Sequence, residues 1–536
     1  MAAEKRVTGA GWRAQWPLWM AWGLFVILLG LTLSTQARSG KVLLPEEDAY
    51  QRLAVAKNLA DRFAWEIIPG EFTSAFGTLL WPLLLAPAFL LLGADALWPV
   101  ILNAILSLVL IALVYRAIRK VISSPAAQGV LLAVMVAGLP LVPLAAAGME
   151  HVLFLVLMVV FLEQWARRMQ DSSAAGLAPM VLMAFLLAAT RYEGMLLVAL
   201  AAFFLLLKRD FAAAVLLPIA AAVPLAVFGF FSWRAGWLPV PASVYLRRAE
   251  LIPSDLSQWP SVVFRSLDVL GVNPDLRATV LLLTLLPAWL GLTNRLKSVR
   301  EREFHAPAFA FLTILAYLTL VGDRGYRYDA WLVMLGAWAI LPALGKILPA
   351  DFRELRKDAV TLFAGGALAV LLGFPLVNRG VQGAIQFTQS LEQMKGIGRT
   401  ASVWAAECAS GPVATDAPGT IAFLTGNGSV VDLSGFVGLR AFRERRAGDI
   451  RSEWMQAEAE RSGATAAVIF HPALQAQAAL IWTRAGGWRQ TDCTVCGSAE
   501  IFLPADDPEP RQCAESFLTG LPPEVIRMEP KGGAAE

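Results

Sequence analysis

Three consecutive acidic residues open the most polar stretch in the otherwise apolar N-terminal part of the chain. Glu46, Glu47 and Asp48 begin the segment PEEDAYQRLAVAKNLADRFAWEIIPGEF at 45–72. Adjacent carboxylates suit two kinds of chemistry: one acts as a general base toward a hydroxyl group, and a pair binds a divalent cation. Partial burial raises the pKa of a carboxyl group and makes it a stronger base. The structural alternative is that acids in the first turn of a helix stabilise its dipole.

The residues that follow these acids have the periodicity of an amphipathic helix. The apolar positions recur at helical spacing on one face: Ala49, Leu53, Ala56 and Ala60. The polar positions fall largely on the other face: Gln51, Arg52, Asn58, Asp61 and Arg62. This pattern predicts a helix suited to lie at a membrane surface.

Ionisable residues at the ends of apolar runs form a second group of candidates. They occur in GMEH at 148–151, in ATRYEG at 189–194, in YLRR at 245–248 and in GDRGYRYD at 322–329. Charge near a membrane interior is costly, so it is read first as functional. The structural alternatives stay open. Glu150 with His151 fits an interfacial pair, Arg247 with Arg248 fits two snorkelling side chains, and 322–329 fits a solvated loop.

Composition places the chain in a membrane. Of 536 residues 57% are hydrophobic and 16% are charged, and the mean hydropathy is +0.58. A soluble domain lacks the interior to bury that much apolar surface. The apolar residues come in blocks long enough to span a bilayer. A net charge of +3 is too small to indicate nucleic-acid binding.

The order of apolar blocks and basic clusters predicts a topology. Candidate spans lie near 17–35, 97–116, 126–147, 150–167, 177–190, 194–207, 212–232, 276–293, 306–322, 330–348 and 359–377. Basic clusters between them fit cytoplasmic loops, which places the N-terminus in the cytoplasm and the C-terminal region outside. Between the outer loop after the first span and the basic cluster at 116–120, the chain must cross the membrane an odd number of times. The apolar stretch at 76–93 is therefore predicted to be an interfacial or re-entrant helix, which gives about eleven crossings. Twelve crossings, with 116–120 outside, is the alternative.

Beyond residue 378 the composition changes to that of a soluble domain. Helical periodicity near 386–406 and 451–463 alternates with β-rich segments at 429–433, 466–470 and 500–504, which predicts an α/β domain over 379–536. The final residues, 521–536, read as frayed. All four cysteines lie in this domain, which favours disulfides in an oxidising compartment: Cys408, Cys493, Cys496 and Cys513. Their pairing is open, and a zinc site at the CxxC of 493–496 is the weaker alternative.

Several segments resemble the GT-C-fold glycosyltransferases, in the order that family shows them. The segment at 46–72 is similar to the family's acidic first outer loop, and AAAGMEHVLF (145–154) and ATRYEGMLL (189–197) resemble two of its short turns. FFSWRAGWLPVPASVYLRR (230–248) and VATDAPGTIAFLTGNGSVVDLSGFVG (413–438) resemble a later loop and a soluble-domain segment. The likeness is nearest to arabinofuranosyltransferase-like and mannosyltransferase-like proteins. The chain departs from the family at Glu47, Tyr192 and 240–241, which bears on substrate identity.

The resemblance implies a fold and a reaction. It implies a transmembrane catalytic module at 1–378, with a first outer loop at about 36–75, and an extracytoplasmic α/β domain at 379–536. The activity is transfer of a sugar from a polyprenyl-phosphate donor to a glycan, lipid or protein in the bacterial inner membrane. Asp48 would be the base and Glu47 its partner or a metal ligand.

The same resemblance implies substrate-binding residues at Arg52, Lys57, Glu150, Arg191, Glu193, Tyr245, Arg247, Asp323, Arg324 and Arg327. No metal site is readable, because three histidines are scattered along the chain; Mg²⁺ or Mn²⁺ stays an open alternative, since family members differ in this respect. A non-catalytic envelope scaffold and a transporter of lipid-linked sugars are the competing functions. A transporter would show inverted repeats, and none is apparent.

Overall fold

The computed structural model describes residues 15–37, 42–171, 176–248, 273–292, 302–321, 325–347, 359–426, 429–490, 497–503, 508–522 and 525–528. The chain forms two compact units. The first, here the helical unit, comprises residues 1–40, 100–225 and 250–385. The second, here the mixed unit, comprises residues 41–99, 226–249 and 386–536.

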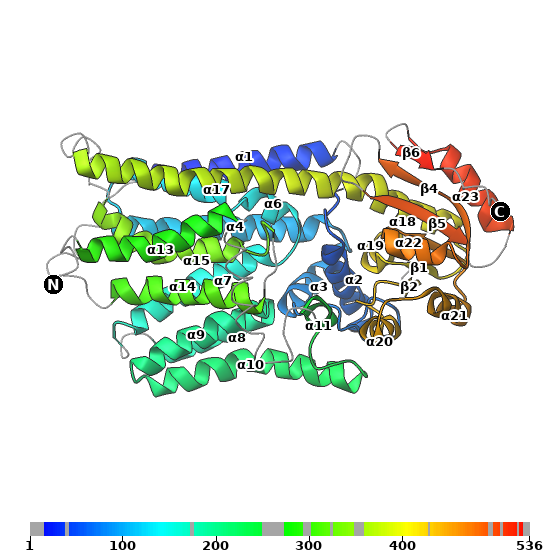
Figure 1. The fold of residues 1–536 in the computed structure, drawn as a ribbon, viewed down its shortest axis with the longest axis horizontal. Coiled ribbons are helices and arrows are strands. Elements are labelled where there is room, and N and C mark those ends of the chain that lie inside the picture. The colour runs from blue at the N-terminus through cyan, green and yellow to red at the C-terminus, as the bar shows by residue number, and fades with distance from the viewer. Residues whose placement is uncertain are drawn as a thin grey trace. The chain divides into compact units, whose positions relative to one another are not determined.

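The helical unit is a bundle of apolar helices (Figure 1). Its helices are α1 (Trp16–Ala37), α4 (Leu97–Val121), α5 (Pro125–Gly138), α6 (Leu141–Ala146), α7 (His151–Arg168), α8 (Leu177–Thr190), α9 (Glu193–Leu207), α10 (Phe211–Arg234), α13 (Pro274–Leu292), α14 (Arg302–Leu320), α15 (Ala330–Ile347) and α17 (Ala359–Gln393). The last turns of α10 and α17 and the first turn of α4 belong to the mixed unit. Aromatic side chains tie helices together, as where Trp165 stacks on Phe309 with 4.6 Å between ring centroids.

The segment ATRYEG separates two helices, as the sequence predicts. α8 ends at Thr190, Arg191 adopts an extended backbone, and α9 begins at Glu193. Glycine is required at position 194, because a Cβ atom there would lie 2.6 Å from the carbonyl oxygen of Leu187. The tight turn therefore depends on the missing side chain.

The expected number of membrane crossings is not reproduced. Three of the described helices are long and apolar enough to span a bilayer, at 16–36, 97–121 and 211–234. Shorter apolar helices, of 10–17 described residues, lie at 80–92, 125–138, 177–190, 193–207, 305–320 and 330–345. A bilayer core of about 30 Å needs about 20 helical residues. The prediction of eleven spans is wrong by this measure, since several of the predicted blocks form shorter helices; membrane association itself is supported.

The mixed unit combines helices with one six-stranded sheet (Figure 1). Its helices are α2 (Glu47–Arg62), α3 (Leu80–Leu92), α11 (Ala242–Arg248), the π-helix η5 (Met394–Arg399), α18 (Thr400–Cys408), α19 (Pro418–Thr425), α20 (Leu439–Ala447), α21 (Ser452–Ser462), α22 (Pro472–Ala478) and α23 (Pro508–Thr519). Its strands are β1 (Val413–Thr415), β2 (Val430–Asp432), β3 (Ala466–Ile469), β4 (Thr483–Gln490), β5 (Ser498–Leu503) and β6 (Val525–Met528). The strand order is β2-β1-β3-β5-β4-β6.

The sheet has a parallel half and an antiparallel half. β2, β1 and β3 run parallel, with α19 connecting β1 to β2, whereas β5, β4 and β6 pair in antiparallel fashion. The predicted strands near 429–433, 466–470 and 500–504 are confirmed. The prediction that residues 521–536 are frayed is wrong in part, because residues 525–528 form β6 and pair with β4.

The sheet is covered on both faces, and its three parallel strands, β1, β2 and β3, are buried along their full length. Along β3, Ala466 and Val468 join one apolar cluster and Ala467 and Ile469 join the other. This alternation is the two-residue period of a strand. Trp404 and Trp488 are the largest side chains of the first cluster.

One of the predicted disulfides is present. Cys408 at the end of α18 is bonded to Cys513 in α23, across 105 residues of sequence. Cys493 and Cys496 lie outside the described residues. The Cys408–Cys513 bond holds α18 and α23 together on one face of the sheet.

We expect loss of this bond to destabilise the mixed unit. Cys408→Ser should lower the free energy of unfolding by about 2–5 kcal/mol, because the bond closes a long loop in the unfolded chain. Cys513→Ser and the double variant should show the same loss as the single variant, measured by chemical unfolding of the detergent-solubilised protein. Additive losses would contradict the pairing.

Candidate functional site

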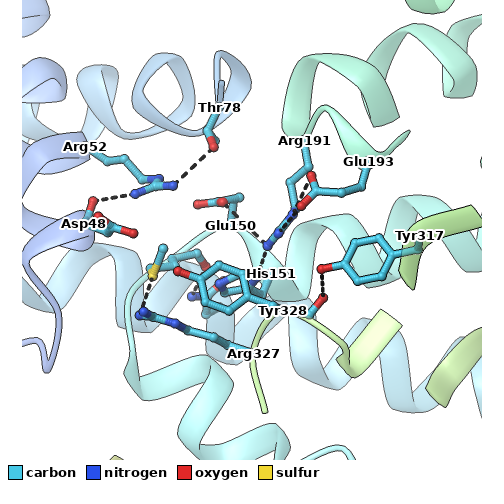
Figure 2. Close-up of polar contacts among 12 residues, drawn as sticks. Asp48, Arg52, Thr78, Glu150, His151, Arg191, Glu193, Tyr317, Arg327 and Tyr328 are labelled. Carbon is cyan, nitrogen blue, oxygen red and sulfur yellow. Dashed lines mark hydrogen bonds and ion pairs between the residues drawn. The ribbon is translucent and has the colours of Figure 1, made fainter. Parts of the chain in front are cut away.

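Asp48 and Arg52 form the polar start of α2 in the mixed unit (Figure 2). Asp48 is half-buried, and Arg52, one helical turn later, is 7% exposed. The Arg52 guanidinium donates to the Asp48 carbonyl at 2.5 Å and to the Thr78 hydroxyl at 3.5 Å. It also lies 5.0 Å from the centroid of the Phe76 ring. Arg52 is thus a fixed cation, one helical turn from Asp48, the residue that the sequence singled out as a base.

Glu47 has a different set of partners. Its carboxylate accepts hydrogen bonds from the Gly419 amide at 2.6 Å and the Thr420 amide at 2.9 Å. The Thr420 hydroxyl also donates to it. Burial raises the pKa of Glu47 to about 7, although these hydrogen bonds act in the opposite direction; the nearby charge of Asp48 raises it further. Both carboxylate oxygens of Glu47 therefore bind the N-terminus of α19.

Helix α19 is held by α2 at both of its ends, and the two helices lie side by side (Figure 1). At the C-terminal end, the Lys57 ammonium donates to the Gly426 carbonyl at 3.4 Å. Glu47 at the N-terminal end and Lys57 at the C-terminal end thus complement the dipole of α19. Gly419 permits the close approach, because a Cβ atom there would lie 2.6 Å from the Gln51 amide nitrogen. Lys57, predicted to bind substrate, contacts the C-terminal end of α19.

A second acid caps a second helix of the mixed unit. Glu71 accepts a hydrogen bond of 2.5 Å from the Leu439 amide at the start of α20, and burial raises the pKa of Glu71. Nearby, the Thr73 hydroxyl donates to the Val437 carbonyl at 3.1 Å. The carboxylate of Asp432 fixes the same loop by accepting from the amides of Val437 and Gly438, each at 2.8 Å. Glu71 was not predicted from the sequence. The available signal was an acidic residue in the loop that follows the amphipathic helix.

The helical unit contains a buried charge cluster (Figure 2). Arg191 binds Glu193 through two nitrogens, at 2.6 and 3.3 Å, and also contacts the Nδ1 atom of His151. The Glu150 carboxylate lies 4.0 Å from the Arg191 guanidinium, and the side chains of Glu150 and Arg191 are 2% and 7% exposed. The structure thus brings together Glu150, Arg191 and Glu193. Two carboxylates compensate the charge of Arg191.

The remaining predicted substrate-binding residues are only partly covered by the structure. The guanidinium of Arg327 lies 4.8 Å from the centroid of the Tyr328 ring and 3.7 Å from the Met149 sulfur. Asp323 and Arg324 lie outside the described residues. Tyr245 packs against α20, with its ring centroid 6.0 Å from that of Phe442. Arg247 belongs to α11, but its side chain is outside the described part of the structure.

A buried ion network was not predicted at all. Arg379 of α17 donates to Asp275 of α13 at 2.7 Å and also pairs with Asp329, which precedes α15. Asn273 donates to Asp329 at 3.1 Å, and the three charged side chains are 3–7% exposed. The available signal in the sequence was a single basic residue, Arg379, directly after a long apolar run. The network joins three helices of the helical unit.

Comparisons with known proteins do not identify a relative. No model of a protein family matches the chain, and a search of curated proteins finds no significant match. Among the described residues, no group of three or more His, Cys, Asp or Glu side chains could hold a metal ion. The case for function therefore rests on the residues themselves.

Glu47 should make the stability of the protein pH-dependent. Its pKa is raised from 4.5 to about 7 in the folded protein, so the fold binds this proton more tightly than the unfolded chain does. The resulting stabilisation is lost as the pH rises through this range. We expect the difference in unfolding free energy between wild type and Glu47→Gln to shift by about 3 kcal/mol between pH 5 and pH 8. Glu453→Gln, at an exposed position, is the control; a pH-independent difference for Glu47→Gln would contradict the assignment.

Removing Arg379 should destabilise the helical unit strongly. Arg379→Met leaves two buried carboxylates without their shared guanidinium, at an expected cost of about 3–5 kcal/mol. Thermal unfolding of the detergent-solubilised protein, followed by tryptophan fluorescence, measures the loss. Arg451→Met, at an exposed position in the mixed unit, is the matched control. Equal melting temperatures for the two variants would show that the network contributes little.

Proposed function

We propose that the chain is a GT-C-type glycosyltransferase that moves a sugar from a polyprenyl-phosphate donor to an extracytoplasmic acceptor. The observation that carries this proposal is the arrangement of Asp48 and Arg52: a half-buried carboxylate lies one helical turn from a buried, fixed guanidinium. Its support is the chemistry of this pair together with the resemblance of 46–72 to the first outer loop of that family.

The proposed reaction is a single displacement at the anomeric carbon of the sugar. Asp48 takes the proton of the acceptor hydroxyl while the acceptor oxygen bonds to that carbon. The bond from the carbon to the phosphate oxygen breaks, and its electron pair leaves with the polyprenyl phosphate. The anomeric configuration is inverted, and the leaving phosphate gains negative charge that cations must stabilise.

The proposed cations differ in what supports them. Arg52 has a fixed guanidinium, because a carbonyl, a hydroxyl and an aromatic ring hold it. Arg247, Arg324 and Arg327 are phosphate ligands by resemblance alone. Arg191 is compensated by Glu193 and Glu150, so we assign it to fixing the turn between α8 and α9.

The proposal includes a setting in the bacterial inner membrane. In it the chain crosses the membrane several times, the N-terminus is cytoplasmic, and the mixed unit faces outward. The Cys408–Cys513 disulfide supports this orientation, because such bonds persist in oxidising compartments. Helix α3, with 13 residues, is short for a crossing, and it exposes Leu83, Leu90 and Leu91, which fits an interfacial helix.

Two other functions compete with the enzyme. A transporter of lipid-linked sugars would hold ionisable residues near mid-membrane. The ion pairs of Arg191 and Arg379 instead involve residues at helix ends, such as Glu193 and Asp275. A non-catalytic scaffold would tolerate the loss of a carboxylate in the first outer loop. The residue that distinguishes these functions is Asp48.

The decisive test is transfer of labelled sugar by membranes that contain equal amounts of each variant. Wild type, Asp48→Asn and Asp61→Asn are offered a panel of polyprenyl-phosphate sugars; Asp61 is an exposed acid on the same helix. We expect Asp48→Asn to lose at least about 100-fold in rate, the usual contribution of a general base, and Asp61→Asn to match wild type. Equal rates for all three proteins would remove Asp48 as the base. No transfer from any donor would favour the scaffold or the transporter.

A further inference from the structure

We infer that Glu47 is a positioning residue, which with Gly419 and Thr420 forms a clasp that sets the orientation of Asp48. We call this group the α19 clasp. It makes the α/β sheet of the mixed unit part of the catalytic apparatus. The inference rests on the proposed function, because it assigns a role within the same site.

The contacts of Glu47 suit a structural anchor rather than a base. One carboxylate oxygen accepts from the Gly419 amide, and the other accepts from the amide and the hydroxyl of Thr420. A base must direct a lone pair toward the proton that it removes. The Glu47 oxygens instead satisfy amide groups at the start of α19 that have no partner within that helix.

The anchor is itself fixed to the sheet. Helix α19 begins directly after β1, and the connecting residue Asp416 accepts hydrogen bonds from the amides of Phe470 and His471, at 2.9 and 2.7 Å. These amides follow the end of β3, the neighbouring parallel strand. The start of α19 is therefore held by two strands of the central sheet.

Helical geometry carries this restraint from Glu47 to Asp48. Consecutive residues of an α-helix project about 100° apart, so fixing the direction of one side chain fixes that of the next. The contact between Lys57 and Gly426 restrains α2 a second time, ten residues further along the helix. With α2 held against α19 at two points, it has little freedom to rotate or slide. The catalytic direction of Asp48 is thus set by residues about 370 positions away in the sequence.

The test changes α19 and leaves every acid of α2 intact. Thr420→Val removes the hydroxyl that binds Glu47 and keeps the shape of the side chain. Thr420→Ser keeps the hydroxyl, so it should restore function. Thr425→Val is the matched control, because Thr425 lies on the same helix and its hydroxyl donates to Ile421 within α19.

We expect Thr420→Val to lower kcat by about 10-fold or more, the effect of a small misplacement of a reacting group. The KM for the donor should stay within about 2-fold, because the substituted residue does not contact the donor in this proposal. Thr420→Ser and Thr425→Val should retain the wild-type kcat. A wild-type kcat in Thr420→Val, or a change confined to KM, would overturn the inference.

A second measurement separates the clasp from the proposed function. Amide hydrogen exchange reports the opening of α2 without any substrate. The first two turns of α2 should exchange faster in Thr420→Val than in Thr425→Val. Unchanged exchange would refute the clasp even if Asp48 proved to be the base. Faster exchange without sugar transfer from any donor would retain the clasp as a structural contact and reject its catalytic role.

Discussion

The mixed unit depends on one half-buried carboxylate, that of Glu47, at the N-terminus of α19. Burying a charge is costly, and the raised pKa of Glu47 records that cost. Three donors and the positive end of a helix dipole offset it. Because three donors of α19 bind its two oxygens, the acid and its donors must meet in one geometry. This constraint sets how α2, and with it Asp48 and Arg52, lies against the sheet.

The local patterns of the sequence predicted much of the mixed unit. The spacing of Ala49, Leu53 and Ala56 indicated α2, and the β-rich runs indicated β2, β3 and β5. β4 escaped prediction because its sequence, TRAGGWRQ, includes two glycines and lacks a run of branched residues. β6 is a four-residue edge strand that depends on pairing with β4. Short strands of this kind are defined by their neighbours, which a local pattern does not contain.

The partners of individual charges were harder to predict than the charges themselves. An acidic residue in the first turn of a helix looks the same in the sequence whether it stabilises its own helix or caps a neighbouring helix. Glu47 and Lys57 therefore read as site residues, whereas the structure gives each a partner at one end of α19. Arg379 was overlooked because its two carboxylates, Asp275 and Asp329, come from distant segments. Hydropathy likewise located apolar blocks but not the helix lengths that decide which blocks can cross a membrane.

Glu47 and Asp48 illustrate how environment, rather than residue type, assigns roles. The two side chains carry the same functional group and are adjacent in sequence, yet α2 turns them in different directions. One meets the amides of α19 and becomes part of the framework. The other, which is also half-buried, lies one turn from a guanidinium that is held by its own contacts. A pair of carboxylates with separate environments can divide positioning and proton transfer between them. In the proposed mechanism such a division gives each of the two consecutive acids its own role, whereas a metal-binding pair would need both side chains to face one ion.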